Sequence, residues 1–224
     1  MKIVLREECL EHFKMFEHSD CSILLIQAQA GQGKTTFAHQ CQQETNRTST
    51  WISCTTKDQD PLVLYDKIVR ALIPDSEAAF KRFQHEIVKQ SSLNEALELM
   101  KLKVSDLVGQ VSGSQLLFID DLHLIQPSTE SLKLLEHLVD RSTYRLKYIL
   151  LTRHPLQMNK QAMFSGSRFM QIDNSMLAFS REETAKLLNQ ALNIHCSMEQ
   201  MRTMYQKTQG WVTGLLLFAS GARS

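Results

Sequence analysis

Short apolar runs alternate along this chain with longer stretches in which apolar residues recur every three or four positions. The short runs predict β-strands, because a parallel strand that is buried on both faces is apolar throughout. We expect five strands, at residues 22–28, 50–54, 115–121, 146–153 and 168–172. The longer stretches predict helices at residues 9–18, 33–45, 61–73, 77–89, 93–108 and 128–141. This alternation is typical of an α/β protein in which helices flank a parallel five-stranded sheet, with ligands at the carboxyl ends of the strands.

After about residue 177 the pattern predicts helices only. Ser180 is followed three positions later by Glu183, a pairing that caps the N-terminus of a helix. Further helices are expected at residues 197–206 and 211–220. The methionines expected in their core are Met198, Met201 and Met204. We therefore expect two domains: a sheet domain at residues 1–176 and a small all-helical domain at residues 177–224.

Residues 28–36 read Ala-Gln-Ala-Gly-Gln-Gly-Lys-Thr-Thr and directly follow the first apolar run. A strand, a glycine-bearing turn and a helix start in this order predict a phosphate-binding loop. Gly31 and Gly33 let the backbone turn tightly, so that successive N–H groups face one anion. We expect Lys34 to reach the β- and γ-phosphates and Thr35 to offer its hydroxyl to Mg²⁺. The expected nucleotide-binding residues of this loop are Ala30, Gly31, Gln32, Gly33, Lys34, Thr35 and Thr36.

One position departs from the strict form of this motif. The glycine expected five residues before Gly33 is Ala28. Alanine is acceptable at the end of a strand as long as its φ is negative. The alternative is a chance Gly-Gln-Gly-Lys turn in a basic surface loop, but the flanking strand and helix favour the phosphate loop.

The apolar run that begins at Gln115 ends in two carboxylates, Asp120 and Asp121. Where such a strand ends beside a phosphate loop, Asp120 can hold Mg²⁺, directly or through water, and Asp121 can orient or deprotonate an attacking water. The alternative is that the two acids cap a helix, since the capping residues Ser128 and Ser131 follow closely. The order of the two motifs along the chain favours a catalytic metal site.

Arg153 stands at the end of the apolar strand 146–153 and is followed by His154 and Pro155. If this strand lies next to the phosphate loop, the guanidinium faces the nucleotide and can sense its γ-phosphate. The alternative is an ordinary surface arginine at a strand end. His123 and His154 are expected near the same edge, and the sequence assigns them no role.

Length and composition narrow the class of protein. The chain has 224 residues, of which 43% are hydrophobic, and can bury one substantial α/β core together with a small appended domain. Its formal charge of +1 provides no broad attraction to nucleic acid or to an anionic membrane. No apolar segment approaches the roughly 20 residues of a membrane span, and the polar start of the chain is no secretory signal. We therefore expect a cytoplasmic protein that makes no membrane contact.

The five cysteines are scattered, and no Cys-x-x-Cys pair occurs among them. This spacing predicts small core residues in a reducing compartment rather than a structural zinc site. The cysteines are Cys9, Cys21, Cys41, Cys54 and Cys196.

The order of several segments resembles the nucleotide-binding module of the STAND class of P-loop NTPases, in its branch of MalT-like, LuxR-type bacterial transcriptional regulators. The resemblance runs through nearly the whole chain. The matching segments are Val4-Leu-Arg-Glu7, Gln29-Ala-Gly-Gln-Gly-Lys-Thr35, Trp51-Ile-Ser53 with Asp60-Pro61, Phe118-Ile-Asp-Asp-Leu-His-Leu-Ile125, Leu150-Leu-Thr-Arg153, Phe179-Ser-Arg-Glu-Glu183 and Thr208-Gln-Gly-Trp-Val-Thr-Gly-Leu215.

The resemblance implies an AAA-like ATPase domain with a helical lid, in which ATP favours an active, self-associating state and ADP a closed one. It places Arg6 by the adenine or its phosphates, makes Arg153 the sensor arginine, and closes the Gly210-Trp211 helix over the base. Related modules often have proline two residues after this glycine, where this chain has Val212. DNA binding is expected only through a domain absent from this chain, which stops at Ser224 and resembles a fragment of a longer regulator or a short stand-alone relative.

We therefore expect an ATP-binding and slowly hydrolysing switch. Two other hypotheses stay open: a P-loop kinase that phosphorylates a small molecule, and an interaction scaffold whose nucleotide is never hydrolysed. A kinase needs an arginine-rich lid, and residues 179–224 offer only Arg181, Arg202 and Arg223.

Overall fold

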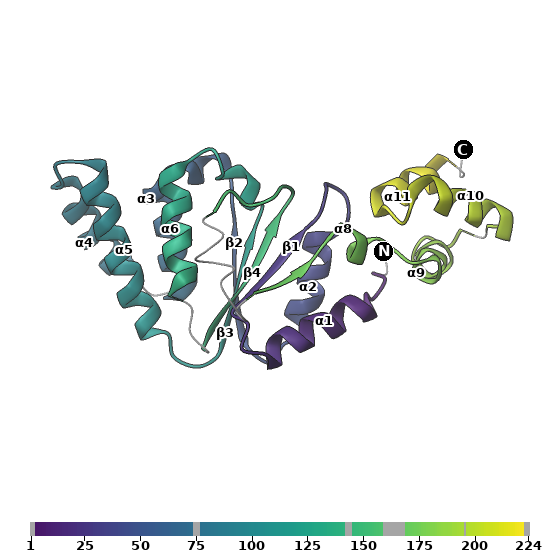
Figure 1. Ribbon diagram of the computed structural model, residues 1–224, viewed down its shortest axis with the longest axis horizontal. Helices are drawn as coiled ribbons and strands as arrows, with labels where there is room; N and C mark the ends of the chain where they lie inside the picture. Colours follow the sequence, from purple (N-terminus) through teal and green to yellow (C-terminus); the bar gives the residue numbers. More distant parts are fainter. Residues whose placement is uncertain (1–2, 74–76, 142–144, 159–168, 195, 222–224) are drawn as a thin grey trace.

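The computed structural model describes residues 3–73, 77–141, 145–158, 169–194 and 196–221. Within these residues, five parallel strands form one sheet in the order β2-β3-β4-β1-β5 (Figure 1). The strands are Ile23–Gln27 (β1), Thr48–Ser53 (β2), Gln115–Asp120 (β3), Leu146–Thr152 (β4) and Phe169–Ile172 (β5). The predicted parallel five-stranded sheet is thus confirmed. Arg168, the expected first residue of the last strand, lies outside the described residues.

The central strand β4 lies between β3 and β1, and all seven of its residues are buried. Parallel pairing aligns Gln27, at the end of β1, with Thr152, at the end of β4. It also aligns Ser53 of β2 with Asp120 of β3. The strands therefore end together at one edge of the sheet, the edge at which parallel sheets bind their ligands.

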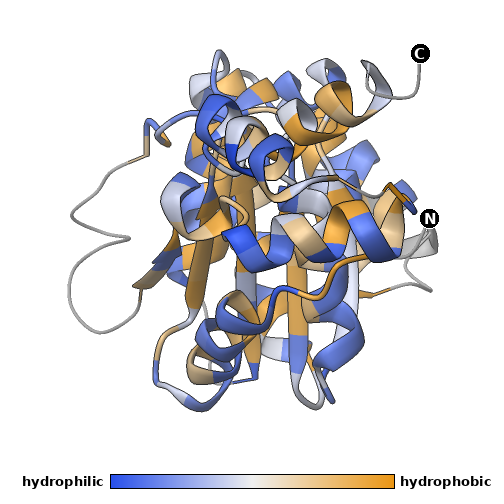
Figure 2. Cartoon of the chain, turned by 90° about the vertical axis from the view of Figure 1, so that its right-hand side faces the viewer, coloured by the Kyte–Doolittle hydropathy of each residue, from blue (hydrophilic) through white to orange (hydrophobic). Residues whose placement is uncertain are grey.

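Helices cover both faces of this sheet (Figure 1). The helices on one face are α1 (Glu7–His18) and α2 (Lys34–Glu44). Those on the other face are α3 (Pro61–Leu72) and α6 (Thr129–Asp140), with α4 (Glu77–Val88) and α5 (Leu93–Gln110) outside them. The strands are orange over most of their length in Figure 2, whereas the helices mix blue and orange. This contrast reflects burial of both faces of the sheet but of only one side of each helix.

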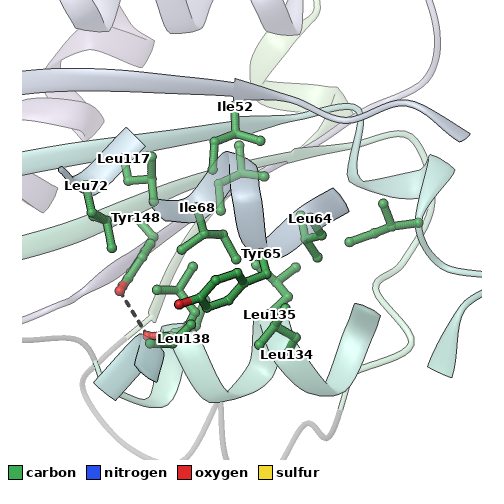
Figure 3. Close-up of a cluster of buried hydrophobic side chains, with 14 of the residues drawn as sticks. Ile52, Leu64, Tyr65, Ile68, Leu72, Leu117, Leu134, Leu135, Leu138 and Tyr148 are labelled. Atoms are coloured by element: carbon green, nitrogen blue, oxygen red, sulfur yellow. Dashed lines mark hydrogen bonds between the residues drawn. The ribbon is translucent and has the colours of Figure 1, made fainter. Parts of the chain in front are cut away.

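Tyr148 shows how the sheet is joined to the helices on the second face. Its side chain points from β4 toward α6, and its hydroxyl donates a hydrogen bond to the carbonyl oxygen of Leu138 at 2.9 Å (Figure 3). Ile68 of α3 and Leu135 of α6 belong to the same buried cluster. Burial raises the pKa of Tyr148 far above its ordinary value, so this hydroxyl remains a neutral donor.

Side-chain caps fix several helix starts where the sequence predicts them. Asp60 accepts a hydrogen bond from the backbone N–H of Leu62, and Pro61 occupies the first helical position of α3. Ser180 and Glu183 form the predicted reciprocal capping box at the start of α9 (Arg181–Lys186). Each cap satisfies backbone donors that the first turn of a helix leaves unpaired.

Lys147 is a buried cation on β4 that caps the C-terminal end of α1. Its ammonium donates to the carbonyl oxygens of Ser19 at 2.7 Å, Phe16 at 2.8 Å and Glu17 at 3.1 Å. It also lies 4.9 Å from the centre of the Phe16 ring. Burial lowers the pKa of Lys147, while the carbonyls of the helix terminus satisfy its donors. A lysine at the second position of an otherwise largely apolar strand thus joins α1 to the sheet.

The C-terminal helices bury a hydrophobic cluster of their own, which includes Leu188, Met204 and Leu215 together with Val4 from the start of the chain. These helices are α9, the π-helical turn η3 (Leu187–Ala191), α10 (Met198–Thr208) and α11 (Val212–Gly221). The short helix α8 (Asn174–Leu177) instead packs Leu177 into the cluster between the sheet and the helices α1 and α2. None of the helices in the described residues is both long and apolar enough to span a membrane.

One prediction about this cluster is wrong. Met204 is buried as expected and Met201 packs against the cluster, but the side chain of Met198 is exposed. Met198 is the first residue of α10, directly after its N-cap Ser197, so it lies a turn ahead of the buried face.

Candidate functional site

The loop between β1 and α2 has the backbone conformation that its glycines predict. Gly31 and Gly33 both lie in the left-handed region, with φ of 76° and 85°, where a side chain would be strained. Ala28, which replaces the motif's first glycine, is buried and is not among the residues with positive φ. Gly33 is the N-cap of α2 and offers no side-chain acceptor, so the first N–H groups of this helix are left for an anion.

Lys34 extends back over this loop. Its ammonium donates to the carbonyl oxygens of Ala28 at 2.6 Å and Gln29 at 3.0 Å. The residue is only 8% exposed. Burial and the neighbouring Arg153 lower the pKa of Lys34, whereas Asp120 and Asp121 raise it. Lys34 directly precedes Thr35, whose hydroxyl bonds Asp120, so the lysine belongs to the part of the loop that contacts the end of β3.

Thr35 and Asp120 join the loop to the end of β3. The hydroxyl of Thr35 donates to one carboxylate oxygen of Asp120 at 2.7 Å, and the other oxygen accepts the backbone N–H of Asp121 at 2.7 Å. Asp120 is 4% exposed. A hydroxyl and a carboxylate in contact are hard oxygen donors of the kind that Mg²⁺ prefers.

Asp121 occupies a strained backbone position directly after β3. Its φ is 55°, in the left-handed region that few non-glycine residues adopt. Although it precedes the short turn η2 (Leu122–Leu124), its side chain makes no capping hydrogen bond, so the helix-cap alternative has no support. One of its carboxylate oxygens lies 3.8 Å from the Arg153 guanidinium. Because β4 pairs with β1, Arg153 follows a strand that lies next to the phosphate loop. This neighbouring position is the one that the sensor hypothesis requires.

His123 also belongs to this cluster, although the sequence assigned it no role. Its Nδ1 is buried without a hydrogen bond and lies 3.8 Å from Asp121 Oδ1. Its ring meets that of His154 edge-on, with 6.1 Å between the ring centres. Burial and then Arg153 lower the pKa of His123. Nothing local in the sequence indicates this contact, because it depends on the left-handed turn at Asp121.

An apolar cavity of about 130 Å³ opens beside the loop. It is bordered by Gly33 and Thr36 at the start of α2 and by hydrophobic side chains from three parts of the chain. These side chains include Val4, Phe37, Phe179, Leu187 and Val212. Its lining is predominantly apolar, as is usual for sites that bind small organic molecules.

Arg6 forms one wall of this cavity, and its guanidinium is bound to other parts of the protein. It donates to the carbonyl oxygen of Leu177 at 2.7 Å and to the Glu183 carboxylate at 2.9 Å. The guanidinium also lies 4.5 Å from the centre of the Phe179 ring. Arg6 thus ties the N-terminal segment to the C-terminal helices and reaches the edge of the cavity.

These features together define the class of protein. The loop after β1 has two glycines in the left-handed conformation and the buried Lys34. Thr35, the next residue, donates a hydrogen bond to Asp120 at the end of β3. This arrangement is the site of a P-loop NTPase. The donors fit a polyphosphate, since the first N–H groups of α2 have no side-chain cap and Lys34 adds a positive charge beside them. The chain belongs to the AAA domain family, whose model matches residues 17–158. It is thus an ATP-binding P-loop NTPase module.

Curated relatives resemble the chain over most of its length. The HTH-type transcriptional regulator MalT of Vibrio cholerae is 24% identical over 215 residues, which cover 93% of this chain and 23% of that protein. The serine/threonine-protein kinase PknK of Mycobacterium tuberculosis is 22% identical over 204 residues, covering 90% of this chain and 18% of that protein. The chain therefore spans less than a quarter of the length of these relatives.

Solved structures agree with this fold. The Walker-type ATPase of Pyrococcus abyssi superposes with a TM-score of 0.61 at 15% identity, over 99% of this chain and 68% of that chain. AMPPCP-bound DnaA from Aquifex aeolicus superposes with a TM-score of 0.54 at 15% identity, over 96% of this chain and 60% of that chain. At such identities the likeness establishes the fold alone.

Proposed function

We propose that this chain is the ATP-binding, slowly hydrolysing switch module of a STAND-type transcriptional regulator. The observation that carries the proposal is the hydrogen bond from Thr35, the residue after the loop lysine Lys34, to Asp120 at the end of β3. Similarity to MalT over 93% of the chain supports the regulatory class. In this proposal the sheet domain is residues 1–176 and the helical lid is residues 177–224, and any DNA contact belongs to another domain of the full regulator.

The phosphates are bound by the loop. In this proposal the backbone N–H groups of residues 30–36 donate to the phosphates, and the dipole of α2 adds partial positive charge at the same point. Lys34 leaves the carbonyls of Ala28 and Gln29 and donates to the β- and γ-phosphates. The ion pairs it gains there are stronger than the neutral carbonyl bonds it gives up.

Hydrolysis is assigned to the groups at the ends of β3 and β4. Thr35 and Asp120 supply oxygen ligands for Mg²⁺, which neutralises charge on the phosphates when it is bound. Asp121 orients the attacking water and accepts its proton. When ATP binds, Arg153 moves away from Asp121 and contacts the γ-phosphate. The Asp121 carboxylate is then free to act on the attacking water, so its activity depends on bound ATP.

The apolar cavity is assigned to the base. Val212 lines it where related modules often have proline, and a β-branched aliphatic side chain can pack against a flat ring as proline does. Arg6 lines this cavity, and its guanidinium is already hydrogen-bonded to other residues of the protein. It contacts the adenine side of the nucleotide rather than its phosphates.

The ATP-bound state favours self-association and the ADP-bound state a closed, resting form. Measuring ADP release with no added acceptor distinguishes this switch from the other hypotheses. The switch releases ADP slowly, a small-molecule kinase stays nearly idle until its acceptor is added, and a scaffold releases none. Release of ADP only upon addition of an acceptor would contradict the proposal.

Replacing Asp121 by asparagine is expected to leave ATP affinity within about two-fold and to lower the hydrolysis rate by roughly 100-fold or more, the usual contribution of a general base. Phosphate release and calorimetric ATP binding measure the two effects separately. Asp140→Asn, at an exposed position on α6, is the matched control. Unchanged turnover in Asp121→Asn would reject Asp121 as the residue that positions water.

A further inference from the structure

The segment that leads into α11 is bonded to the phosphate loop. The indole N–H of Trp211 donates to the carbonyl oxygen of Ala30 at 3.0 Å. The backbone N–H and the hydroxyl of Thr213 donate to the carbonyl oxygen of Gly31 at 3.0 and 3.1 Å. Three donors from the C-terminal helices therefore hold two consecutive carbonyls of the loop.

These bonds control the amide groups of the loop. In a trans peptide the carbonyl of one residue and the N–H of the next point in opposite directions, and the described residues contain no cis peptide. A donor that holds the Ala30 carbonyl thus fixes the direction of the Gly31 N–H. In the same way, Thr213 fixes the direction of the Gln32 N–H through the Gly31 carbonyl. A hydrogen bond accepted by a carbonyl also polarises its peptide, which makes the N–H a better donor.

The fit between these segments is too close for larger residues. A Cβ added to Gly31 would lie 2.2 Å from the Thr213 hydroxyl oxygen, and one added to Gly214 would lie 2.6 Å from the Trp211 ring. Gly210 has φ of 76°, and a Cβ there would lie 2.2 Å from the Phe179 carbonyl oxygen. The glycines on either side of Trp211 therefore let its ring and Thr213 approach the loop.

We propose that Trp211 and Thr213 are positioning residues for phosphate binding. They orient the N–H groups of Gly31 and Gln32 toward the triphosphate from the opposite side of the loop, without touching the nucleotide. Val212, between them, lines the cavity assigned to the base. Residues 211–213 therefore contact both the proposed base site and the phosphate loop. This inference rests on the proposed role of the loop in binding ATP. Displacement of the C-terminal helices then weakens phosphate binding directly.

Calorimetric titration with inorganic triphosphate and Mg²⁺ tests this role, because the probe has no base to contact the cavity. Trp211→Phe removes the indole donor and keeps an aromatic ring, and Thr213→Val removes the hydroxyl and keeps the shape and the backbone N–H. Each variant is expected to bind triphosphate roughly three- to ten-fold more weakly, the usual effect of one hydrogen bond. Thr213→Ser and Trp51→Phe, the latter on β2, should bind like the wild type.

A second measurement needs no ligand. In amide NMR spectra of the free protein, Trp211→Phe is expected to shift the Gly31 resonance most strongly, and Thr213→Val that of Gln32. A merely structural role in the C-terminal helices would move resonances of α10 and α11 but leave those two amides unchanged.

The outcomes separate this inference from the proposed function. If the wild type binds triphosphate, Lys34→Ala loses it, and both Trp211→Phe and Thr213→Val bind normally, the positioning role is wrong and the proposed function stands. If the wild type and Lys34→Ala both fail to bind, the proposed function itself fails.

Discussion

Asp120→Asn is expected to reduce Mg²⁺-dependent ATP hydrolysis by about 1,000-fold, the largest effect of any single change at this site. The loss follows from removing a carboxylate ligand from a metal that contributes several kcal/mol to stabilising the transition state. Asparagine keeps the size of the side chain and a hydrogen bond with Thr35, so the fold should persist. The measurement is the steady-state rate of phosphate release at saturating ATP and Mg²⁺.

The control for this change is Asp66→Asn, which removes a carboxylate that pairs with Arg70 on the outside of α3. It should hydrolyse ATP at the wild-type rate. Thermal unfolding should show similar stability for both variants. Retention of more than about a tenth of the wild-type rate by Asp120→Asn would be incompatible with a metal ligand at this position.

Lys34→Ala is expected to weaken ATP binding by about 100-fold. The ammonium makes charge-assisted hydrogen bonds with the phosphates, and each such bond is worth about 1.5–3 kcal/mol. The variant also loses the hydrogen bonds to the carbonyls of Ala28 and Gln29, the first of which is buried, so thermal unfolding of the apo protein is measured alongside binding. Calorimetric titration with ATP gives the affinities directly.

Lys133→Ala serves as the comparison, since Lys133 is an exposed lysine of α6. It should bind ATP like the wild type, which would exclude a general effect of lost positive charge. Equal ATP affinity in the wild type and Lys34→Ala would remove the assignment of the loop as the phosphate site.

Local patterns in the sequence predicted the strands and the phosphate loop well. A strand buried on both faces is marked by its own composition, and β1, β3 and β4 have this composition. The edge strand β2 was expected at residues 50–54 but begins at Thr48. Its first residues are polar and partly exposed, because an edge strand is only partly covered, so the apolar run marks only its second half.

Contacts between distant segments could not be predicted in this way. Arg6 bonds Glu183 across 177 positions of sequence, and Trp211 bonds Ala30 across 181. The strand order, with β4 between β3 and β1, is likewise set by packing rather than by local preference. Lys147 also bonds carbonyl oxygens at the end of α1, at least 128 positions earlier in the sequence, and no local pattern indicates those partners. Local motifs therefore indicate the candidate site residues, whereas the long-range hydrogen bonds of Arg6 and Trp211 follow only from the packed structure.

In the proposed function a metal–triphosphate complex lies between the loop of residues 28–33 and Asp120. The most direct test binds ATP with Mn²⁺ in place of Mg²⁺ and measures paramagnetic broadening of the backbone amide resonances. The amide resonances of residues 33–36 and 119–121 are expected to broaden beyond detection while those of α10 stay sharp. Broadening centred on any other segment, or no broadening when ATP is bound, would rule out this position of the metal and the triphosphate.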